Sequence, residues 1–264
     1  MPTFDSVQWD SGNGVGLASR MRGLSSAMAL SEHFEVPIQS TWRSDWACPG
    51  DYTYSFMPLP HYDRAGLGGE ILDYREACEG RAGLGWEGAW GKLTDGGYFE
   101  PDELPLERFL DIAHEQLFYF RLQPSIAEAI AEMTAGWGKV TGLHIRRTDK
   151  TAQMRRCGLT PSSDLEMWKA IEKDNADKFF LATDDPEVVK MMETQLAGRI
   201  IRWNHVFSRH QQQGQHELSF RWTGMTDAVL DLYTLAKCDH IIGTKGSVFS
   251  RVAARLGSIP LQLH

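Results

Sequence analysis

A cluster of charged residues follows a short apolar stretch in the middle of the chain. The stretch 140–145 reads Val-Thr-Gly-Leu-His-Ile, and Arg146, Arg147, Asp149 and Lys150 come directly after it. If the stretch is a regular strand, side chains alternate between its two faces, so His144 and Arg146 share one face. The planar fork of arginine binds phosphate through two parallel hydrogen bonds. We therefore predict that this strand end binds a diphosphate.

An ion-pair network is the alternative explanation of these cations. Asp184 and Asp185 follow a second apolar stretch, 179–182, and either carboxylate could neutralise an arginine or contact a sugar. Asp185 precedes Pro186, a pairing typical of a helix start, so we expect Asp185 to be an N-cap. We expect one arginine of the 146–147 pair to serve the structure and the other to serve the ligand.

Two further segments carry candidate donor-binding residues. Residues 243–247, Gly-Thr-Lys-Gly-Ser, join a predicted strand at 240–243 to a predicted helix at 247–256 that Gly257 would close. Ser247 could cap this helix, contact a phosphate, or do both. Asp231 lies on a predicted helix at 226–238, where it could accept hydrogen bonds from a guanine edge or a ribose hydroxyl, or simply face solvent.

A glycine-rich loop near the N-terminus could also approach phosphate. Gly14 and Gly16 lie just before a predicted helix, and glycine lets backbone N–H groups come close to phosphate oxygens at a helix start. The preceding residues are too polar to indicate a clear strand. The loop alone is a weak signal, and a plain flexible connection explains it equally simply.

Strands and helices alternate after residue 136, and this order predicts a parallel, doubly wound sheet. The break at 136–138, Gly-Trp-Gly, suggests a domain boundary, with an N-terminal lobe at 1–136 and a second lobe at 137–264. Residues 44–105 have no clear period. Trp86 and Trp90 in that region could stack on a sugar or act as buried anchors.

Composition excludes several classes of protein. The 264 residues carry a net charge of -8, which argues against a nucleic-acid-binding surface. No apolar run is long enough to span a membrane. The four cysteines and the histidines lack metal-ligand spacing, so we expect no metal site. We expect no signal peptide and a cytoplasmic location, and the oligomeric state stays open.

The segment 144–150, His-Ile-Arg-Arg-Thr-Asp-Lys, resembles the signature of the superfamily of α1,6-fucosyltransferases, nodulation fucosyltransferases and protein O-fucosyltransferases. The blocks at 180–186, 231–239 and 243–253 are similar to later family blocks and occur in the same order. The resemblance implies an α/β, GT-B-like fold of two Rossmann-type lobes with parallel sheets, the first lobe reduced. It also implies that the lobe at 1–136 is the acceptor side and that the lobe at 137–264 binds the nucleotide sugar. It also implies inverting, metal-independent transfer of fucose from GDP-fucose to a glycan or other hydroxyl acceptor, without a further cofactor.

The resemblance assigns roles residue by residue. It implies that Arg146 grips the β-phosphate, that His144 and Asp231 meet the guanosine and that Ser247 meets the diphosphate. Arg147, Asp149 and Lys150 would form the polar scaffold, with Asp184 or Asp185 beside the donor. We count Arg146, Asp149 and Lys150 as the candidate catalytic residues.

One position departs from the family pattern. Met154 stands where the α1,6 enzymes carry a glutamate that can act as base. The base is therefore unassigned, and Asp149, Asp184 or an acid from 44–105 are candidates. Two alternatives remain: a transferase of the same fold that uses another nucleotide sugar, and a catalytically silent protein that binds GDP or a glycan.

Overall fold

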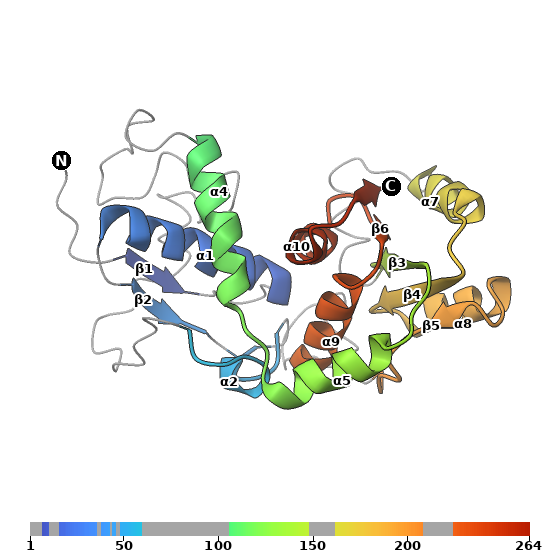
Figure 1. Ribbon diagram of the computed structural model, residues 1–264, viewed down its shortest axis with the longest axis horizontal. Helices are drawn as coiled ribbons and strands as arrows, with labels where there is room; N and C mark the ends of the chain where they lie inside the picture. Colours follow the sequence, from blue (N-terminus) through green and yellow to red (C-terminus); the bar gives the residue numbers. More distant parts are fainter. Residues whose placement is uncertain are drawn as a thin grey trace, which may run out of the picture. The chain divides into compact units, whose positions relative to one another are not determined.

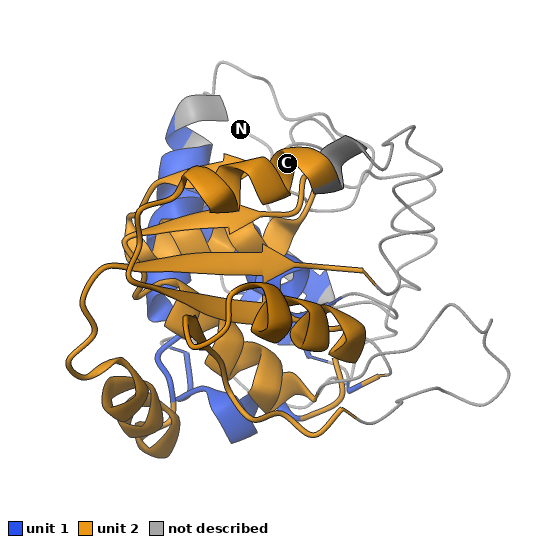
Figure 2. Ribbon diagram, turned by 90° about the vertical axis from the view of Figure 1, so that its right-hand side faces the viewer, with its two compact units in different colours: residues 1–44, 51–122 blue, residues 45–50, 123–264 orange. Residues whose placement is uncertain are grey.

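A computed structural model of the chain describes residues 7–10, 16–35, 38–42, 44–45, 48–59, 106–147, 162–207 and 224–264. The chain divides into two compact units, one made of residues 1–44 and 51–122 and the other of residues 45–50 and 123–264 (Figure 2). Some sequence predictions lie outside the described residues, namely those for Gly14, Trp86, Trp90, Asp149, Lys150 and Met154.

The first unit contains a small parallel sheet. Strand β1 (Val7–Asp10) pairs in parallel with β2 (Ile38–Thr41), and helix α1 (Leu17–Phe34) connects them. Met21, Leu24 and Ala27 of α1 are buried, and α1 packs against α4 (Leu106–Gln116). The short helices α2 (Tyr52–Ser55) and η1 (Leu117–Tyr119) complete the described part of this unit.

Strand β1 is the element that sequence reasoning missed. Its four residues, Val-Gln-Trp-Asp, alternate polar and apolar types over too short a run to give a clear signal. The strand forms because β2 supplies a parallel partner in the register Val7↔Ile38 to Asp10↔Thr41. The glycine-rich segment therefore follows a strand and precedes a helix, which is the context that a phosphate-binding loop requires.

The second unit is built on a parallel sheet, as the alternating pattern predicted. Its described strands lie in the order β5-β4-β3-β6-β7 (Figure 1). Their bounds are β3 Val140–Ile145, β4 Lys178–Thr183, β5 Ile200–Ile201, β6 His240–Gly243 and β7 Leu261–Leu263. The helices of this unit are α5 Pro124–Thr134, α7 Ser162–Lys173, α8 Pro186–Gln195, α9 Met225–Leu235 and α10 Val248–Gly257.

Helices cover both faces of this sheet (Figure 1). On one face Leu143 and Leu181 pack with Met167 of α7 and Met192 of α8 in a continuous apolar core. The other face is closely approached by α9 and α10. A Cβ built on Gly142 would lie 2.8 Å from Leu235 of α9, and one on Gly243 would lie 2.4 Å from the Ser250 hydroxyl of α10. Glycine at these positions lets the helices approach the strands.

The end of α10 differs from the prediction that Gly257 closes it. Gly257 is the last helical residue, and Ser258 takes the left-handed C-cap conformation at φ 51°. A Cβ at Gly257 would lie 2.3 Å from the carbonyl oxygen of Ala236. Gly257 is therefore explained by the close approach of the chain at the end of α9, a contact distant in sequence.

The division of the chain falls earlier than the predicted boundary at residue 136. Helix α5 belongs with the second unit, because it packs against α9 of that unit. Among the helices of the described ranges, none combines the length and the apolar character needed to cross a membrane.

Candidate functional site

The strand order of the second unit locates the ligand site that its topology favours. The chain runs outward from β3 to β4 and β5, then returns to place β6 on the opposite side of β3. Such a reversal opens a crevice at the carboxyl ends of the two central strands, where ligands of open α/β sheets bind. Arg146 follows β3 and Thr244 follows β6, so both lie at this switch point.

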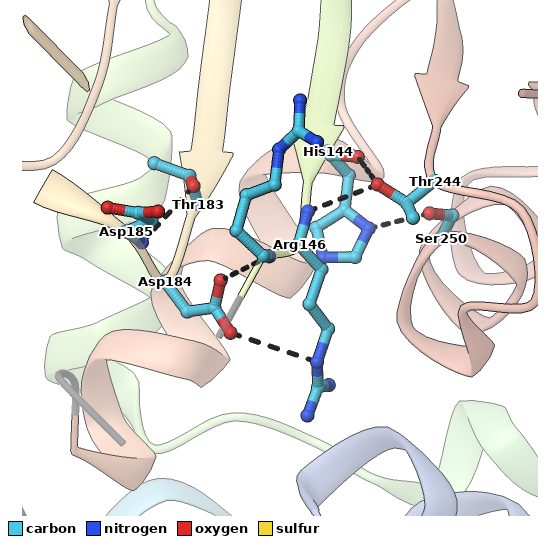
Figure 3. Close-up of polar contacts among 8 residues, drawn as sticks. His144, Arg146, Thr183, Asp184, Asp185, Thr244 and Ser250 are labelled. Carbon is cyan, nitrogen blue, oxygen red and sulfur yellow. Dashed lines mark hydrogen bonds and ion pairs between the residues drawn. The ribbon is translucent and has the colours of Figure 1, made fainter. Parts of the chain in front are cut away.

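Hydrogen bonds tie the ends of β3 and β6 together (Figure 3). The Arg146 backbone N–H donates to Thr244 Oγ1 at 3.1 Å, and the Thr244 N–H donates to the His144 carbonyl at 3.0 Å. Thr244 is buried, which makes these contacts well shielded from water. The backbone that carries the Arg146 side chain is thus fixed at the edge of the sheet.

Asp184 joins the arginine pair to the end of β4. Its Oδ1 accepts a hydrogen bond from the Arg147 backbone N–H at 3.1 Å, and its Oδ2 lies 3.8 Å from Arg146 Nε. Figure 3 shows the Asp184 carboxylate beside Arg146, with a dashed line that marks their ion pair. The side chains of Arg146 and Asp184 are 17% and 15% exposed, so this loose ion pair lies just below the surface. The ion-pair alternative and a phosphate contact are compatible here, because the pair uses Nε at long range.

The start of α10 presents a serine that lacks a capping bond. Ser247 occupies the N-cap position, yet its side chain makes no cap hydrogen bond. The residue is 1% exposed, and within the described part of the chain its Oγ has no hydrogen-bond partner. A buried hydroxyl without a partner is costly, and the first N–H groups of a helix favour an anion. Simple capping therefore does not explain Ser247, whereas a bound phosphate would.

His144 is held between β3 and α10. Its Nδ1 lies 2.7 Å from Ser250 Oγ, and its ring stacks on Phe249 with centroids 4.8 Å apart. Burial lowers the pKa of His144 to about 3, and the charge of Arg146 adds to this effect. His144 is therefore a neutral ring near neutral pH, able to exchange hydrogen bonds with a ligand but unable to supply charge.

This low pKa makes stability sensitive to acid. The unfolded chain takes up a proton at His144 below pH 6.5, whereas the folded protein resists it until about pH 3, so acidification favours unfolding. We expect this one group to remove about 2 kcal/mol of unfolding free energy between pH 7 and pH 5. Urea unfolding of the protein and of His144→Asn at both pH values measures it. Equal losses in the two proteins would contradict the assignment.

Asp185 has the structural role that the sequence predicted. It is the N-cap of α8, with Oδ1 accepting from the Glu187 N–H at 2.9 Å. Its own backbone N–H lies 3.3 Å from the Thr183 hydroxyl (Figure 3). The cap explains Asp185, so of the two carboxylates Asp184 is the one that contacts the arginines.

Asp231 is buried and paired with a histidine that sequence reasoning did not select. His205 Nε2 lies 2.9 Å from Asp231 Oδ1, and His205 Nδ1 lies 3.2 Å from Asp227 Oδ1. Burial tends to lower the pKa of His205, but the two carboxylates outweigh it and raise that pKa to about 9. Burial also raises the pKa of Asp231. No local pattern in the sequence indicated this pairing, since His205 lies in a polar, histidine-rich segment.

The predicted donor residues of the second unit thus gather at one edge. Helices that follow β5 and β6 begin at the carboxyl edge of the sheet, so the first turns of α9 and α10 lie there with the ends of β3 and β4. That edge carries His144, Arg146, Arg147, Asp184 and Ser247, and Asp231 lies in the second turn of α9, where the charge of Asp184 still acts on it. Gly16 lies in the first unit, as the N-cap of α1. Within the described ranges, no cluster of His, Cys, Asp or Glu is arranged to hold a metal ion.

The second unit is an open parallel α/β sheet that carries charged residues at its switch point. Comparison with solved structures shows which fold the chain has. The chain is similar to the NodZ α1,6-fucosyltransferase co-crystallised with GDP (TM-score 0.58, 16% identity, 95% of this chain and 92% of that one). It is also similar to NodZ from Bradyrhizobium (TM-score 0.55, 14% identity, 95% and 93%).

POFUT1 in complex with GDP-fucose is a further similar structure (TM-score 0.55, 10% identity, 99% of this chain and 98% of that one). No protein-family model matches the chain, and no curated protein matches it by sequence. The chain therefore has the GT-B-like α/β fold of these fucosyltransferases. The resemblance stated from the sequence is confirmed at the level of the fold.

Proposed function

We propose that the protein is an inverting, metal-independent glycosyltransferase that moves fucose from GDP-fucose to a hydroxyl of a glycan or other acceptor. One observation carries the proposal: the switch point of the second sheet combines the Arg146 cation with the buried hydroxyl of Ser247 at a helix start, which has no hydrogen-bond partner among the described residues. Both groups suit a diphosphate. The similar structures that contain GDP or GDP-fucose support the choice of nucleotide.

The chemistry needs charge stabilisation at the leaving group. As the bond between the fucose anomeric carbon and the β-phosphate oxygen breaks, negative charge builds on that oxygen, and the acceptor oxygen bonds to the opposite face of the carbon. Arg146 stabilises this charge, which a preorganised cation does most effectively in the transition state. Arg147 contributes its backbone N–H to Asp184 and so fixes the loop that carries both arginines.

The acceptor's proton passes to a base or to water. Asp184 already serves Arg146 and the Arg147 N–H, which favours a structural role for it over that of base. Asp149 and an acid from 44–105 therefore remain our candidate bases, and Asp149 and its sequence neighbour Lys150 lie outside the described residues. Gly14 and Gly16 remain predicted donor contacts of the first unit.

A thermal-shift screen tests the donor class. We expect GDP and GDP-fucose to raise the melting temperature, while UDP and ADP forms at the same concentration do so weakly, because binding to the native state stabilises it by mass action. Release of GDP from GDP-fucose in the presence of acceptor then separates a transferase from a silent binder. Stabilisation by UDP-sugars and not by GDP would reject the proposed donor.

Ser247→Ala should weaken GDP binding without lowering the stability of the fold. Removing a buried hydroxyl that has no partner leaves unfolding free energy unchanged or raises it, whereas the loss of a phosphate contact weakens GDP binding by about 1 kcal/mol, roughly fivefold. Thermal unfolding and calorimetric titration of GDP measure the two effects.

Ser250→Ala is the matched control, because the two serines lie on the same helix. It removes the hydroxyl that bonds His144, so it should lower the melting temperature. If Ser247→Ala is the less stable of the two and binds GDP normally, Ser247 is a structural residue after all.

A further inference from the structure

A strap formed by residues 202–207 runs from the end of β5 along α9. Its Trp203 Nε1 donates to Thr234 Oγ1 at 2.9 Å, and its His205 lies against Asp227 and Asp231. Positions 227, 231 and 234 are spaced by one turn each, so they share one face of α9. The strap therefore follows this helix face and places His205 beside the first turns of α9, at the carboxyl edge of the sheet.

The two ring nitrogens of His205 reach two different carboxylates. Nδ1 lies 3.2 Å from Asp227 Oδ1 and Nε2 lies 2.9 Å from Asp231 Oδ1. Only the imidazolium has N–H donors at both positions, so this geometry fits a charged ring that bridges the pair. Asp227 is also fixed by the Gly224 backbone N–H, which lies 3.1 Å from its Oδ2. Asp227 is consequently a rigidly held partner for the His205 ring.

The contact with His205 determines whether Asp231 is protonated or ionised. This carboxylate is 6% exposed, and Asp184 and Asp227 both repel its charge. Burial and these neighbours favour a protonated, neutral acid, whereas contact with the imidazolium favours the ionised form. His205 contacts Oδ1 of Asp231, and within the described residues the other oxygen, Oδ2, accepts no side-chain hydrogen bond. An ionised carboxylate fixed through one oxygen can accept hydrogen bonds from a ligand at the other.

We propose that His205 is a positioning residue for base selectivity, which holds Asp231 oriented to accept from the N–H donors on the edge of a guanine base. The inference rests on the proposed function, since it deepens the role of the same donor site. Guanine presents a ring N–H and an amino group side by side on that edge. Hypoxanthine lacks the amino group, so a well-oriented carboxylate favours GDP over inosine diphosphate. His205 acts on the ligand only through Asp231. Inorganic pyrophosphate has no base, so its binding does not depend on His205.

Calorimetric titrations with GDP, inosine diphosphate and pyrophosphate test this role in His205→Gln. We expect GDP affinity to fall about tenfold, the preference for GDP over inosine diphosphate to fall toward one, and pyrophosphate affinity to stay within twofold. Trp203→Phe is the matched control, because it removes another hydrogen bond of the same strap without touching Asp231. We expect it to leave all three affinities unchanged.

Coupling between His205 and Asp231 gives a second readout. The double variant with Asp231→Asn should bind GDP no more weakly than Asp231→Asn alone, because His205 has no role once the carboxylate is gone. If His205→Gln does not fold, Asp227→Asn removes the second anchor of the ring, and we expect it to reduce the same GDP preference.

Three outcomes would overturn the inference. These are an unchanged preference for GDP in the folded variant, an equal loss of pyrophosphate binding, and a fully additive double variant. Failure of the proposed function is distinguishable, because the unmodified protein would then show no preference for GDP over UDP.

Discussion

Arg146→Ala is expected to weaken GDP binding and to slow sugar transfer by a larger factor. A charge-assisted contact to the β-phosphate stabilises the bound diphosphate by about 2 kcal/mol, so GDP affinity should fall roughly thirtyfold. The loss in turnover should be larger, about a hundredfold or more, because charge on the leaving oxygen is greatest in the transition state. Calorimetry with GDP and single-turnover transfer measurements report the two losses separately.

Two control variants make this result specific. Arg146→Lys keeps the charge without the planar fork, and we expect it to recover part of the affinity. Arg199→Ala removes an arginine at the opposite edge of the same sheet, where the guanidinium stacks on Phe179 and donates to the Ala176 carbonyl. It should reduce stability and leave GDP affinity intact. An Arg146→Ala protein that binds GDP within twofold of the unmodified one would contradict the assigned role.

Gly257→Ala is expected to give the largest loss of stability, about 3 kcal/mol or more. The added Cβ would lie 2.3 Å from the Ala236 carbonyl oxygen, and backbone atoms of two packed segments must move apart to relieve this overlap. Urea unfolding monitored by circular dichroism measures the change. The neighbouring Ser258→Gly serves as control, since Ser258 has φ 51° and glycine adopts that conformation without strain.

Ser258→Gly should be neutral or mildly stabilising. A Gly257→Ala protein that unfolds within 1 kcal/mol of the original would mean that α10 and the end of α9 are separated more easily than their packing indicates.

Local patterns in the sequence predicted most elements of the second unit. The periodic apolar residues of α9 and α10, the apolar runs of β3 and β4 and the Asp185-Pro186 helix start are all features of neighbouring residues. The carboxyl edge of the sheet could be predicted as the site because parallel strands bring their ends together.

Features that depend on partners distant in the sequence could not be predicted from local patterns. Strand β1 needs β2, Gly257 needs the end of α9, and α5 joins the second unit through its packing on α9. The contact between His205 and Asp231 joins residues 26 positions apart, one in the segment after β5 and the other in α9. Ser247 was predicted to cap the helix, to contact a phosphate or to do both, and the geometry of the helix start adds that its hydroxyl has no hydrogen-bond partner among the described residues.

The residues of the candidate site could be selected from the sequence more fully than their individual roles could be predicted. Arg146, His144, Asp184, Asp231 and Ser247 were all selected from the sequence, and they lie at or beside one sheet edge. The structure adds what each group contacts, such as the neutral His144 ring against Ser250. Such contacts decide whether a polar residue is a cap, a scaffold or a ligand contact.

A crystal structure of the protein with GDP is the most direct test of the claim that this sheet edge holds a diphosphate. We predict phosphate oxygens about 3 Å from the Arg146 guanidinium and from Ser247 Oγ, with the base near Asp231. GDP bound elsewhere, with Arg146 still held by Asp184 and no phosphate at the start of α10, would contradict it.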